Sequence, residues 1–333
     1  MDGTRQRSYA PGRVNLIGDH TDYTGGLVLP MAIDLGTTVD GTRGGSQVRL
    51  RSADESLEAV VDVTERDPAA LTPPWARYVG GVVAELEPQL GFTGSVRTTL
   101  PIGGGLSSSA ALEVAVALAL GFEGTPLELA TLCQRAEHRA SGVPCGIMDQ
   151  LASAAGVADH ALMIDCATLQ ITPVAVPEDV DVVVVHSGHE RSLTGSAYAE
   201  RRAQCEAAEA IIGPLRLATL SDAEGLRDPL MRRRARHVIS ENHRVRAFAG
   251  ALSQGDLVAA GRLMVESHTS LRDDFEVSTP ALDRLVERLL STPGVLGARL
   301  TGAGFGGCVV ALARQATPID GHHVRPAAGA LSG

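Results

Sequence analysis

A dense polar cluster lies near the N-terminus, between Pro11 and Tyr23. Within ten residues it carries an arginine, an amide, two carboxylates and an imidazole, namely Arg13, Asn15, Asp19, His20 and Asp22. Carboxylates accept hydrogen bonds from hydroxyl groups, and an imidazole donates or accepts, so this set suits a polyhydroxylated ligand. The apolar residues at positions 14, 16 and 17 favour an enclosed site. The alternative is a solvated polar turn between two strands.

Glycines and serines follow one another from Leu100 to Ala110, in the sequence LPIGGGLSSSA. We expect a strand to end here, three glycines to turn the chain and three serines to open an apolar helix. Inward-facing backbone N–H groups and the positive end of a helix together predict a phosphate cradle, and a serine hydroxyl can ligate Mg²⁺. Two alternatives stay open, an ordinary capped helix and a dinucleotide-binding turn. Pro101 and the serines at 108 and 109 argue against the dinucleotide-binding turn.

A third cluster, TGAGFGGC, runs from Thr301 to Cys308 and fits the spacing G-x-G-x-x-G. The apolar residues from Cys308 to Ala313 have the pattern of a strand, whereas a dinucleotide site requires a helix after the glycines. We therefore predict a glycine hairpin, which either supports a nearby ligand or is a structural tight turn.

Two acids and a tyrosine complete the candidates. Glu137 lies on a predicted helix, and Asp149 follows in a predicted loop. One carboxylate could hold Mg²⁺ while the other faces a hydroxyl nucleophile. Tyr198 lies at the start of a predicted helix, from which its hydroxyl could reach a ligand. The plainer interpretation is a solvated acid in the first two cases and a packed side chain in the third.

The basic residues exclude several chemistries. All 29 of them are arginines, and the 333-residue sequence contains no lysine. This excludes a P-loop lysine, a protein-kinase strand lysine, a Schiff-base lysine and a Ser-Lys nucleophile pair. Any phosphate must then be held by arginine, backbone N–H groups, a helix N-terminus or a metal ion. The formal net charge of −10 argues against a nucleic-acid partner.

Hydropathy and cysteine spacing indicate the cellular compartment of the protein. No apolar run reaches the roughly 18 residues that a membrane span needs, and the first twelve residues lack an apolar signal core. The five cysteines are scattered without C-x-x-C spacing, so neither a disulfide framework nor a zinc site is indicated. We expect a cytoplasmic protein with no membrane partner.

The elements that must position these residues form a mixed α+β pattern with two lobes. The segment 172–179 contains two prolines and no periodicity, which favours a boundary there, with domains at 1–177 and 178–333. Apolar alternation and turn residues predict strands at 47–52, 94–100, 160–166, 180–186 and on both sides of the third cluster. Helical spacing predicts helices at 108–120, 128–141, 198–212, 230–252, 257–268 and 280–291.

In this order the motifs resemble the GHMP kinase superfamily and, within it, the galactokinases. The resemblance runs from about residue 10 to residue 330. It is carried by GRVNLIGDHTDY, LPIGGGLSSSAALEVA, AEHRASGVPCGIMDQLAS, SHTSLRDDFEVSTPALD and RLTGAGFGGC. It implies a two-lobed GHMP kinase fold with the active site in the cleft between the lobes. It further implies ATP-dependent phosphorylation of the C1 hydroxyl of a sugar, most simply D-galactose, with Mg²⁺ as cofactor.

The resemblance also implies roles for individual residues. Asp149 would be the catalytic base and Arg13 would stabilise the transferring phosphoryl group. The sugar would be bound by Asp19, His20, Asp22, Gly146 and Tyr198. The ATP phosphates would lie against Gly103, Gly104, Gly105, Leu106, Ser107, Ser108 and Ser109, and the adenine near Trp75. Mg²⁺ would be held by Ser109 and Glu137.

The sequence departs from the galactokinase pattern at two places. Asp19 stands where the family usually has glutamate, so its reach toward the far hydroxyl of the sugar is one methylene shorter. Glu190 stands at a position that is commonly basic. The alternatives are therefore a GHMP kinase for another aldose, galacturonate or N-acetylgalactosamine, and a non-catalytic sensor of sugar and ATP. We expect a monomer.

Overall fold

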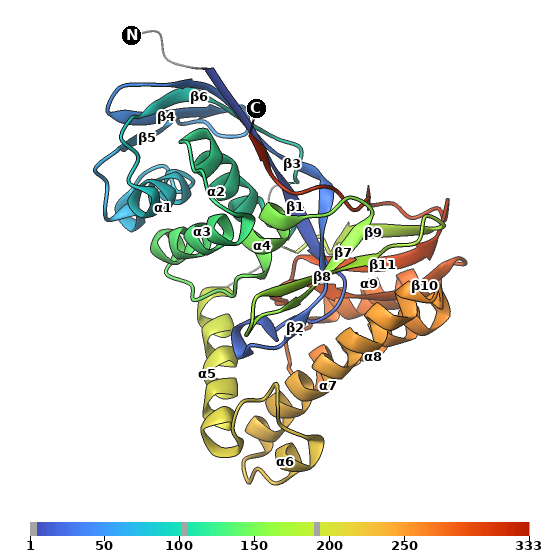
Figure 1. The fold of residues 1–333 in the computed structure, drawn as a ribbon. Helices are drawn as coiled ribbons and strands as arrows, with labels where there is room; N and C mark the ends of the chain where they lie inside the picture. The colour runs from blue at the N-terminus through green and yellow to red at the C-terminus, as the bar shows by residue number, and fades with distance from the viewer. Residues whose placement is uncertain (1–4, 102–104, 190–193, 333) are drawn as a thin grey trace.

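The computed structural model describes residues 5–101, 105–189 and 194–332, and its mixture of helices and sheets confirms the predicted α+β class (Figure 1). A six-stranded sheet forms the upper part of the molecule in this view. Its strands lie in the order β13-β1-β3-β6-β4-β5, and every neighbouring pair is antiparallel except β4 and β6. They are β1 (Arg5–Asn15), β3 (Pro30–Arg43), β4 (Gln47–Ser52), β5 (Ala59–Asp62), β6 (Phe92–Thr98) and β13 (Leu331–Ser332).

Helices pack against one face of this sheet and enclose an apolar core (Figure 1). Val79 and Val83 from the first helix and Val114 from the second are fully buried in that core, together with Phe92 from the sheet. The helices are α1 (Ala76–Leu86), α2 (Ser108–Ala119), α3 (Pro126–Ser141) and α4 (Met148–Ala155).

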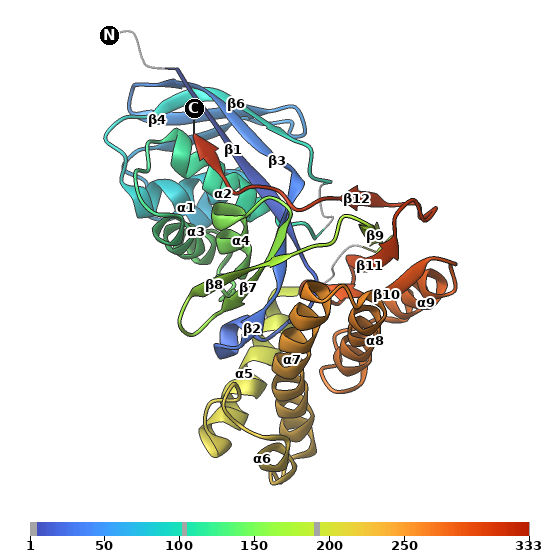
Figure 2. The ribbon, with the colours of Figure 1, turned by 45° about the vertical axis from the view of Figure 1, so that its right-hand side comes forward.

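A second sheet and the later helices form the lower part of the molecule. This sheet is antiparallel, with the strand order β10-β11-β9-β12, and helices α7, α8 and α9 lie beside the sheet (Figures 1 and 2). The strands are β9 (Val180–His186), β10 (Val295–Thr301), β11 (Cys308–Arg314) and β12 (His322–Val324). The helices are α5 (Thr194–Ile212), α6 (Leu220–Glu224), α7 (Pro229–Ser253), α8 (Leu257–Asp273) and α9 (Pro280–Leu290).

A small antiparallel sheet lies between the two parts, with the order β2-β7-β8. Its strands are β2 (Leu27–Val28), β7 (His160–Asp165) and β8 (Gln170–Ala175), and the short 3₁₀ helices are η1 (Asp22–Thr24) and η2 (Pro68–Ala70). One continuous core joins side chains from both parts, including Leu16 and Leu29 from the first and Val184, Val245 and Phe248 from the second. The N-terminal polar cluster is therefore packed directly against the C-terminal helices.

Side-chain caps fix where several predicted helices begin. Thr125 and Glu128 form a capping box at α3, in which each side chain accepts from the backbone N–H of the other residue. Asp228 caps α7 and Thr279 caps α9, and a proline follows each of them at the start of the helix. These local signals explain why the predicted starts of these helices lie within two residues of the observed ones.

One feature of the predicted layout is wrong. Asp149 does not lie in a loop but in the first turn of α4, which was missed because its eight residues are too few to show a helical period. Gly12 directly precedes Arg13 in the N-terminal polar cluster. It lies inside the long strand β1, at a β-bulge where the register with β3 shifts between Pro11 and Arg13.

The expected division at residues 177 and 178 falls in the connection between β8 and β9. The end of the chain does not stay with the second part, however, because β13 pairs with β1 and Pro326 forms a bridge with Ile33. Figure 2 shows this segment running back from β12 to the first sheet. The two-domain division itself stays a prediction. Within the described ranges, no helix has both the length and the apolar character that crossing a membrane requires.

Candidate active site

A cavity of about 330 Å³ lies where the two parts of the molecule meet. The first part contributes residues of β1, the loop after it, α2, α3 and α4, and the second contributes α5 and the glycine-rich turn after β10. Most of the predicted site residues line it, namely Arg13, Asp19, His20, Asp22, Ser109, Glu137, Gly146, Asp149 and Tyr198. Residues separated by more than a hundred positions in the sequence are thus brought to one place.

Arg13 and Asp149 form a two-point ion pair at this cavity. Arg13 Nε donates to Asp149 Oδ1 at 2.8 Å, and Nη2 donates to Oδ2 at 2.6 Å. The arginine side chain is 6% exposed and the aspartate side chain 32%, so the carboxylate is the member that faces the cavity. Such a planar double contact fixes the orientation of both groups.

The bulge in β1 and the serine segment hold this pair in place. Arg13 N donates to Leu106 O at 3.1 Å, and Arg13 Nη1 donates to Gly105 O at 2.8 Å. A Cβ at Gly12 would lie 2.5 Å from Leu106 O, so only glycine allows the two segments to approach this closely. Ser107 Oγ donates to Asp149 Oδ2 at 2.5 Å. The Asp149 carboxylate therefore receives hydrogen bonds from two separate segments.

The predicted phosphate loop lies partly outside the described residues, which do not include Gly103 and Gly104. Gly105 and Ser107 have φ values of 68° and 58°, in the left-handed region that favours glycine. The side chain of Leu106 is buried, so this residue can reach a phosphate only through its backbone N–H. Ser107 precedes α2 but provides no side-chain cap, which leaves the first N–H groups of the helix available for an anion.

Asp22 and Gly146 meet at the wall of the cavity. A Cβ at Gly146 would lie 1.8 Å from Asp22 Oδ2, so no other residue fits beside this carboxylate without displacing it. Burial, and then the charge of Asp149, raise the pKa of Asp22 to about 6. The Asp22 carboxyl group is thus held in a site that disfavours its charge, and among the described residues no arginine is paired with it as Arg13 is with Asp149.

His20 lines the cavity and lies within a group of aromatic side chains. Its ring centroid is 4.7 Å from that of Phe275 and 5.5 Å from that of Tyr198. Burial lowers the pKa of His20 to about 4, so the ring is neutral at pH 7. Nε2 lies 3.2 Å from Ala303 O and Nδ1 lies 3.0 Å from Tyr23 Oη. Because a carbonyl only accepts, Nε2 carries the proton and Nδ1 accepts from the tyrosine.

Ser109, Glu137 and Glu113 form a cluster of oxygen atoms at the inner end of the cavity. Burial raises the pKa of Glu137, and the side chains of Glu113 and Ser109 beside it partly offset this effect. Glu113 is fully buried, and it also accepts from Gln150 Nε2 at 3.2 Å. Burial, and then the neighbouring carboxyl group of Glu137, raise the pKa of Glu113 well above its ordinary value.

These oxygen atoms fit Mg²⁺ when it arrives with a nucleotide. Carboxylate and hydroxyl oxygens are the donors that Mg²⁺ prefers. Within the part of the chain that the structure describes, no group of three or more His, Cys, Asp or Glu side chains could hold a metal ion by itself. An ion bound by Ser109 and Glu137 would therefore complete its coordination with phosphate oxygens and water, which is how Mg²⁺ commonly binds in kinases.

A second cavity of about 300 Å³ adjoins the first. Trp75 lies at its wall with the indole Nε1 donating to Leu57 O at 3.1 Å, and the ring also packs into the core below the first sheet. Ser108 and Ser109 line this cavity at the start of α2. Tyr78 and Ser109 line both cavities, so a ligand in the second one can extend along the serines into the first.

Sequence reasoning missed several residues at the site. Tyr78 lies one helical turn beyond Trp75, so the spacing alone could have placed both side chains on one face. The only sequence signal of Glu113 is that it is a single acid within an apolar run. The glycine-rich turn of the third cluster does support the site, because Gly302 N donates to Asp19 Oδ1 at 2.8 Å and Ala303 O accepts from His20.

The fold and the site together define the chain as a GHMP kinase. The GHMP kinases N terminal domain matches residues 77–157 and the GHMP kinases C terminal domain matches residues 248–321. Mevalonate kinase of Methanococcus jannaschii has the same fold, with a TM-score of 0.68 and 21% identity over 95% of this chain and 92% of that one. At this identity the likeness shows the fold alone.

Within this superfamily the chain belongs to the galactokinase family. The galactokinase galactose-binding signature matches residues 4–43. Galactokinases of Bos taurus and Homo sapiens are 47% and 46% identical to it, each over 95% of this chain and 86% of the relative. The structure of Lactococcus lactis galactokinase complexed with galactose superposes with a TM-score of 0.90 and 33% identity, over 98% of this chain and 95% of that one. The chain is thus related to sugar phosphotransferases over nearly its whole length.

Proposed function

We propose that this protein transfers the γ-phosphoryl group of ATP to the C1 hydroxyl of D-galactose. The observation that carries the proposal is the pairing of Arg13 and Asp149 at the wall of one cavity, next to a second cavity that shares Ser109 with it. A sugar in the first cavity and a nucleotide in the second would meet at these residues. The family membership supports galactose as the sugar.

Asp149 is proposed to act as the base. Its exposed carboxylate would take the proton of the C1 hydroxyl as that oxygen forms a bond to the γ-phosphorus and the bond to the β-phosphate oxygen breaks, releasing ADP. Ser107 and Arg13 both donate to this carboxylate, so its orientation is set before the sugar binds. A base placed in this way typically contributes on the order of 10² to 10⁴ in rate.

Arg13 is proposed to stabilise charge on the transferring group. Its guanidinium is held by Asp149 and by the carbonyl of Gly105, so it stands between the proposed base and the glycine-rich turn. The donors at the start of α2 and at Gly105 to Ser109 would bind the phosphates of ATP, and residues 103 and 104 are expected to take part. Arg13 supplies the positive charge beside the proposed base. The sequence contains no lysine that could supply it instead.

Ser109 and Glu137 are proposed to hold Mg²⁺. When bound, Mg²⁺ neutralises charge on the β- and γ-phosphates. Both residues line the cavity that Asp149 also lines, and Ser109 borders the nucleotide cavity as well. Burial raises the pKa of Glu137, and the neighbouring side chains of Glu113 and Ser109 partly offset this effect.

The sugar is proposed to lie against Asp22, Gly146 and Tyr198, above His20. Asp22 would accept hydrogen bonds from sugar hydroxyls, since its pKa of about 6 leaves it mostly ionised at pH 7. The carboxylates of Asp22 and Asp149 border the same cavity, which favours a neutral sugar over galacturonate. Trp75 is proposed to border the adenine. We also propose a cytoplasmic enzyme, because the spacing of the cysteines indicates no disulfide framework, and a monomer, which light scattering would test.

The proposal is tested by measuring ADP release with Mg-ATP and a panel of sugars. The panel contains galactose, glucose, N-acetylgalactosamine and galacturonate, and phosphorus NMR of the product identifies the phosphorylated oxygen. We expect galactose to give the highest kcat/KM and a product phosphorylated at C1. A higher value for another sugar would replace galactose as the substrate, and binding of both ligands without ADP release would indicate a sensor.

A further inference from the structure

The carboxylate of Asp19 is already bound within the protein. Oδ1 accepts from Gly302 N at 2.8 Å, and Oδ2 is paired with Arg299 Nη2. The aspartate is 1% exposed, although it borders the sugar cavity. Both carboxylate oxygens therefore face the turn after β10 and Arg299. The resemblance to galactokinases, in contrast, implies that Asp19 contacts the sugar directly.

Arg299 is a fully buried guanidinium that depends on Asp19. Its Nη1 donates to Leu16 O at 3.1 Å, and its Nη2 lies 4.0 Å from Glu241 Oε1 in addition to the contact with Asp19. A buried charge is tolerated only when it is paired and hydrogen-bonded. The arginine comes from β10, whereas Asp19 and Leu16 come from the segment after β1. The pair thus joins the two parts of the molecule.

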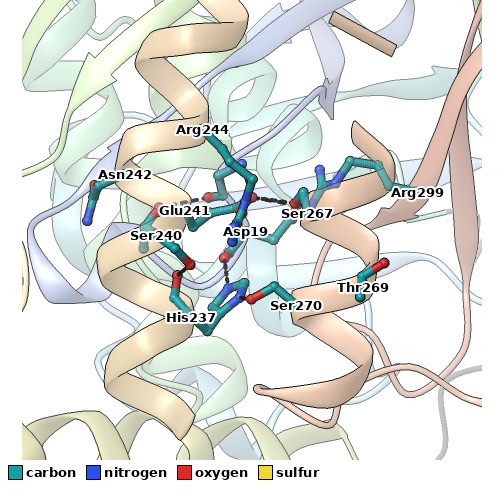
Figure 3. A network of polar contacts seen from close by, with 12 residues as sticks. Asp19, His237, Ser240, Glu241, Asn242, Arg244, Ser267, Thr269, Ser270 and Arg299 are labelled. Carbon is teal, nitrogen blue, oxygen red and sulfur yellow. Dashed lines mark hydrogen bonds and ion pairs between the residues drawn. The ribbon is translucent and has the colours of Figure 1, made fainter. Parts of the chain in front are cut away.

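Glu241 on α7 ties the same segment to two helices (Figure 3). It accepts from Gly18 N at 3.0 Å, from Ser267 Oγ on α8 at 2.5 Å and from Arg244 Nε at 2.6 Å. Burial opposes its charge, but Arg244, His237 and Arg299 together with Ser267 lower the pKa of Glu241 to about 2. Glu241 is therefore ionised throughout the physiological range, and it holds the backbone immediately before Asp19.

The backbone of Asp19 is fixed as well. His237 Nε2 lies 3.2 Å from Asp19 O, and Nδ1 lies 2.9 Å from Ser270 Oγ (Figure 3). The next residue, His20, has a φ of 65°. This conformation costs energy for any residue with a side chain, and it persists only where the surrounding contacts impose it. Asp22 follows two residues later at the cavity wall. The contacts of Asp19 therefore determine where His20 and Asp22 lie.

We infer that Asp19 and Arg299 are positioning residues, which hold His20 and Asp22 in the sugar cavity, and that Asp19 does not contact the sugar. The inference rests on the proposed sugar kinase activity. It implies that Asp19 does not discriminate between sugars that differ in one hydroxyl group, although it affects how tightly each of them binds. The shorter aspartate is suited to this role, because its oxygens meet Gly302 and Arg299 instead of extending into the cavity.

The test compares Asp19→Asn with the unaltered protein on galactose and on its 2-, 3-, 4- and 6-deoxy derivatives. Asparagine keeps an acceptor for Gly302 N but removes the charge that Arg299 needs. We expect the KM for all five sugars to rise by a similar factor, about tenfold or more, with the KM for ATP unchanged. Asp22→Asn is the matched control, and its effect should be smaller for at least one deoxy sugar than for galactose.

Three results would overturn the inference. One is a loss of discrimination against a single deoxy sugar in Asp19→Asn, which would show that Asp19 contacts the missing hydroxyl. Another is a lower thermal midpoint with both KM values unchanged, which would show a structural role only. If Asp19→Asn does not fold, the double variant Asp19→Asn with Arg299→Met is used, since it leaves no unpaired arginine. The third overturning result would be KM values of this double variant that equal those of the unaltered protein. The activity of the unaltered protein on galactose tests the proposed function separately.

Discussion

Replacing Asp22 by asparagine should stabilise the protein while it weakens sugar binding. The pKa of Asp22 is raised from 3.8 to about 6, because burial and Asp149 disfavour the charged form. A folded state that holds a proton more tightly than the unfolded chain loses stability as the pH rises from about 4 to above 6. The difference between the two pKa values corresponds to roughly 3 kcal/mol. Asp22→Asn removes this cost at pH 7.

The assay is urea unfolding of both proteins at pH 7.5, 6 and 4.5. We expect the variant to be more stable by up to about 3 kcal/mol at pH 7.5. The gap should narrow only slightly at pH 6 and fall to about 1 kcal/mol at pH 4.5, where Asp22 is protonated in the folded protein but still mostly ionised in the unfolded chain. Asp179→Asn is the control, because this aspartate is exposed and its replacement should leave the pH profile unchanged.

The same variant should lose activity. A hydrogen bond from a sugar hydroxyl to a charged acceptor contributes about 1.5 to 3 kcal/mol, so kcat/KM for galactose should fall roughly 10- to 150-fold through a higher KM. The reasoning would be refuted if Asp22→Asn were less stable than the unaltered protein at pH 7.5, or if the two proteins had the same pH profile. Either result would mean that the buried carboxylate is compensated by contacts other than those described above.

Three further variants and signals test other parts of the site. Gly146→Ala should abolish galactose binding because its Cβ would lie 1.8 Å from Asp22 Oδ2, whereas Gly250→Ala, where a Cβ meets nothing within 4 Å, should leave kcat/KM unchanged; equal activities would argue against the contact. Arg13→Lys should lower kcat on the order of 10² to 10³, since an ammonium group cannot make the two-point contact with Asp149, and full activity would remove Arg13 from the mechanism. Trp75 is the only tryptophan, so ATP should change the intrinsic fluorescence and galactose alone should not; the reverse pattern would place the nucleotide elsewhere.

The sequence was sufficient where local signals specify structure. Caps and apolar periods placed the later helices, and the run VDVVVVH placed β9 at the observed residues 180–186. The short helix α4 was missed because its two turns are specified by packing of Met148 and Leu151 rather than by a period. The bulge at Gly12 was missed because it depends on the approach of Leu106, which is distant in the sequence.

The site was predicted to the extent that its residues come from recognisable motifs. Arg13, Asp22 and Asp149 were found in this way and lie at one cavity. The partners that decide their behaviour were not found, because they arrive from distant segments. Arg299 meets Asp19 across 280 positions, and no spacing within either motif shows that this charge satisfies the aspartate. The same holds for Glu113, whose only sign in the sequence is an acid within an apolar helix.

The most direct test of the account is the turnover of Asp149→Asn. Asparagine keeps the size of the side chain and an acceptor for Ser107, but it cannot take a proton from the sugar hydroxyl. We expect kcat to fall by at least about 10² while galactose and ATP still bind, as measured by calorimetry and by Trp75 fluorescence. A variant that binds both ligands and keeps the kcat of the unaltered protein would contradict the assignment of Asp149 as the base.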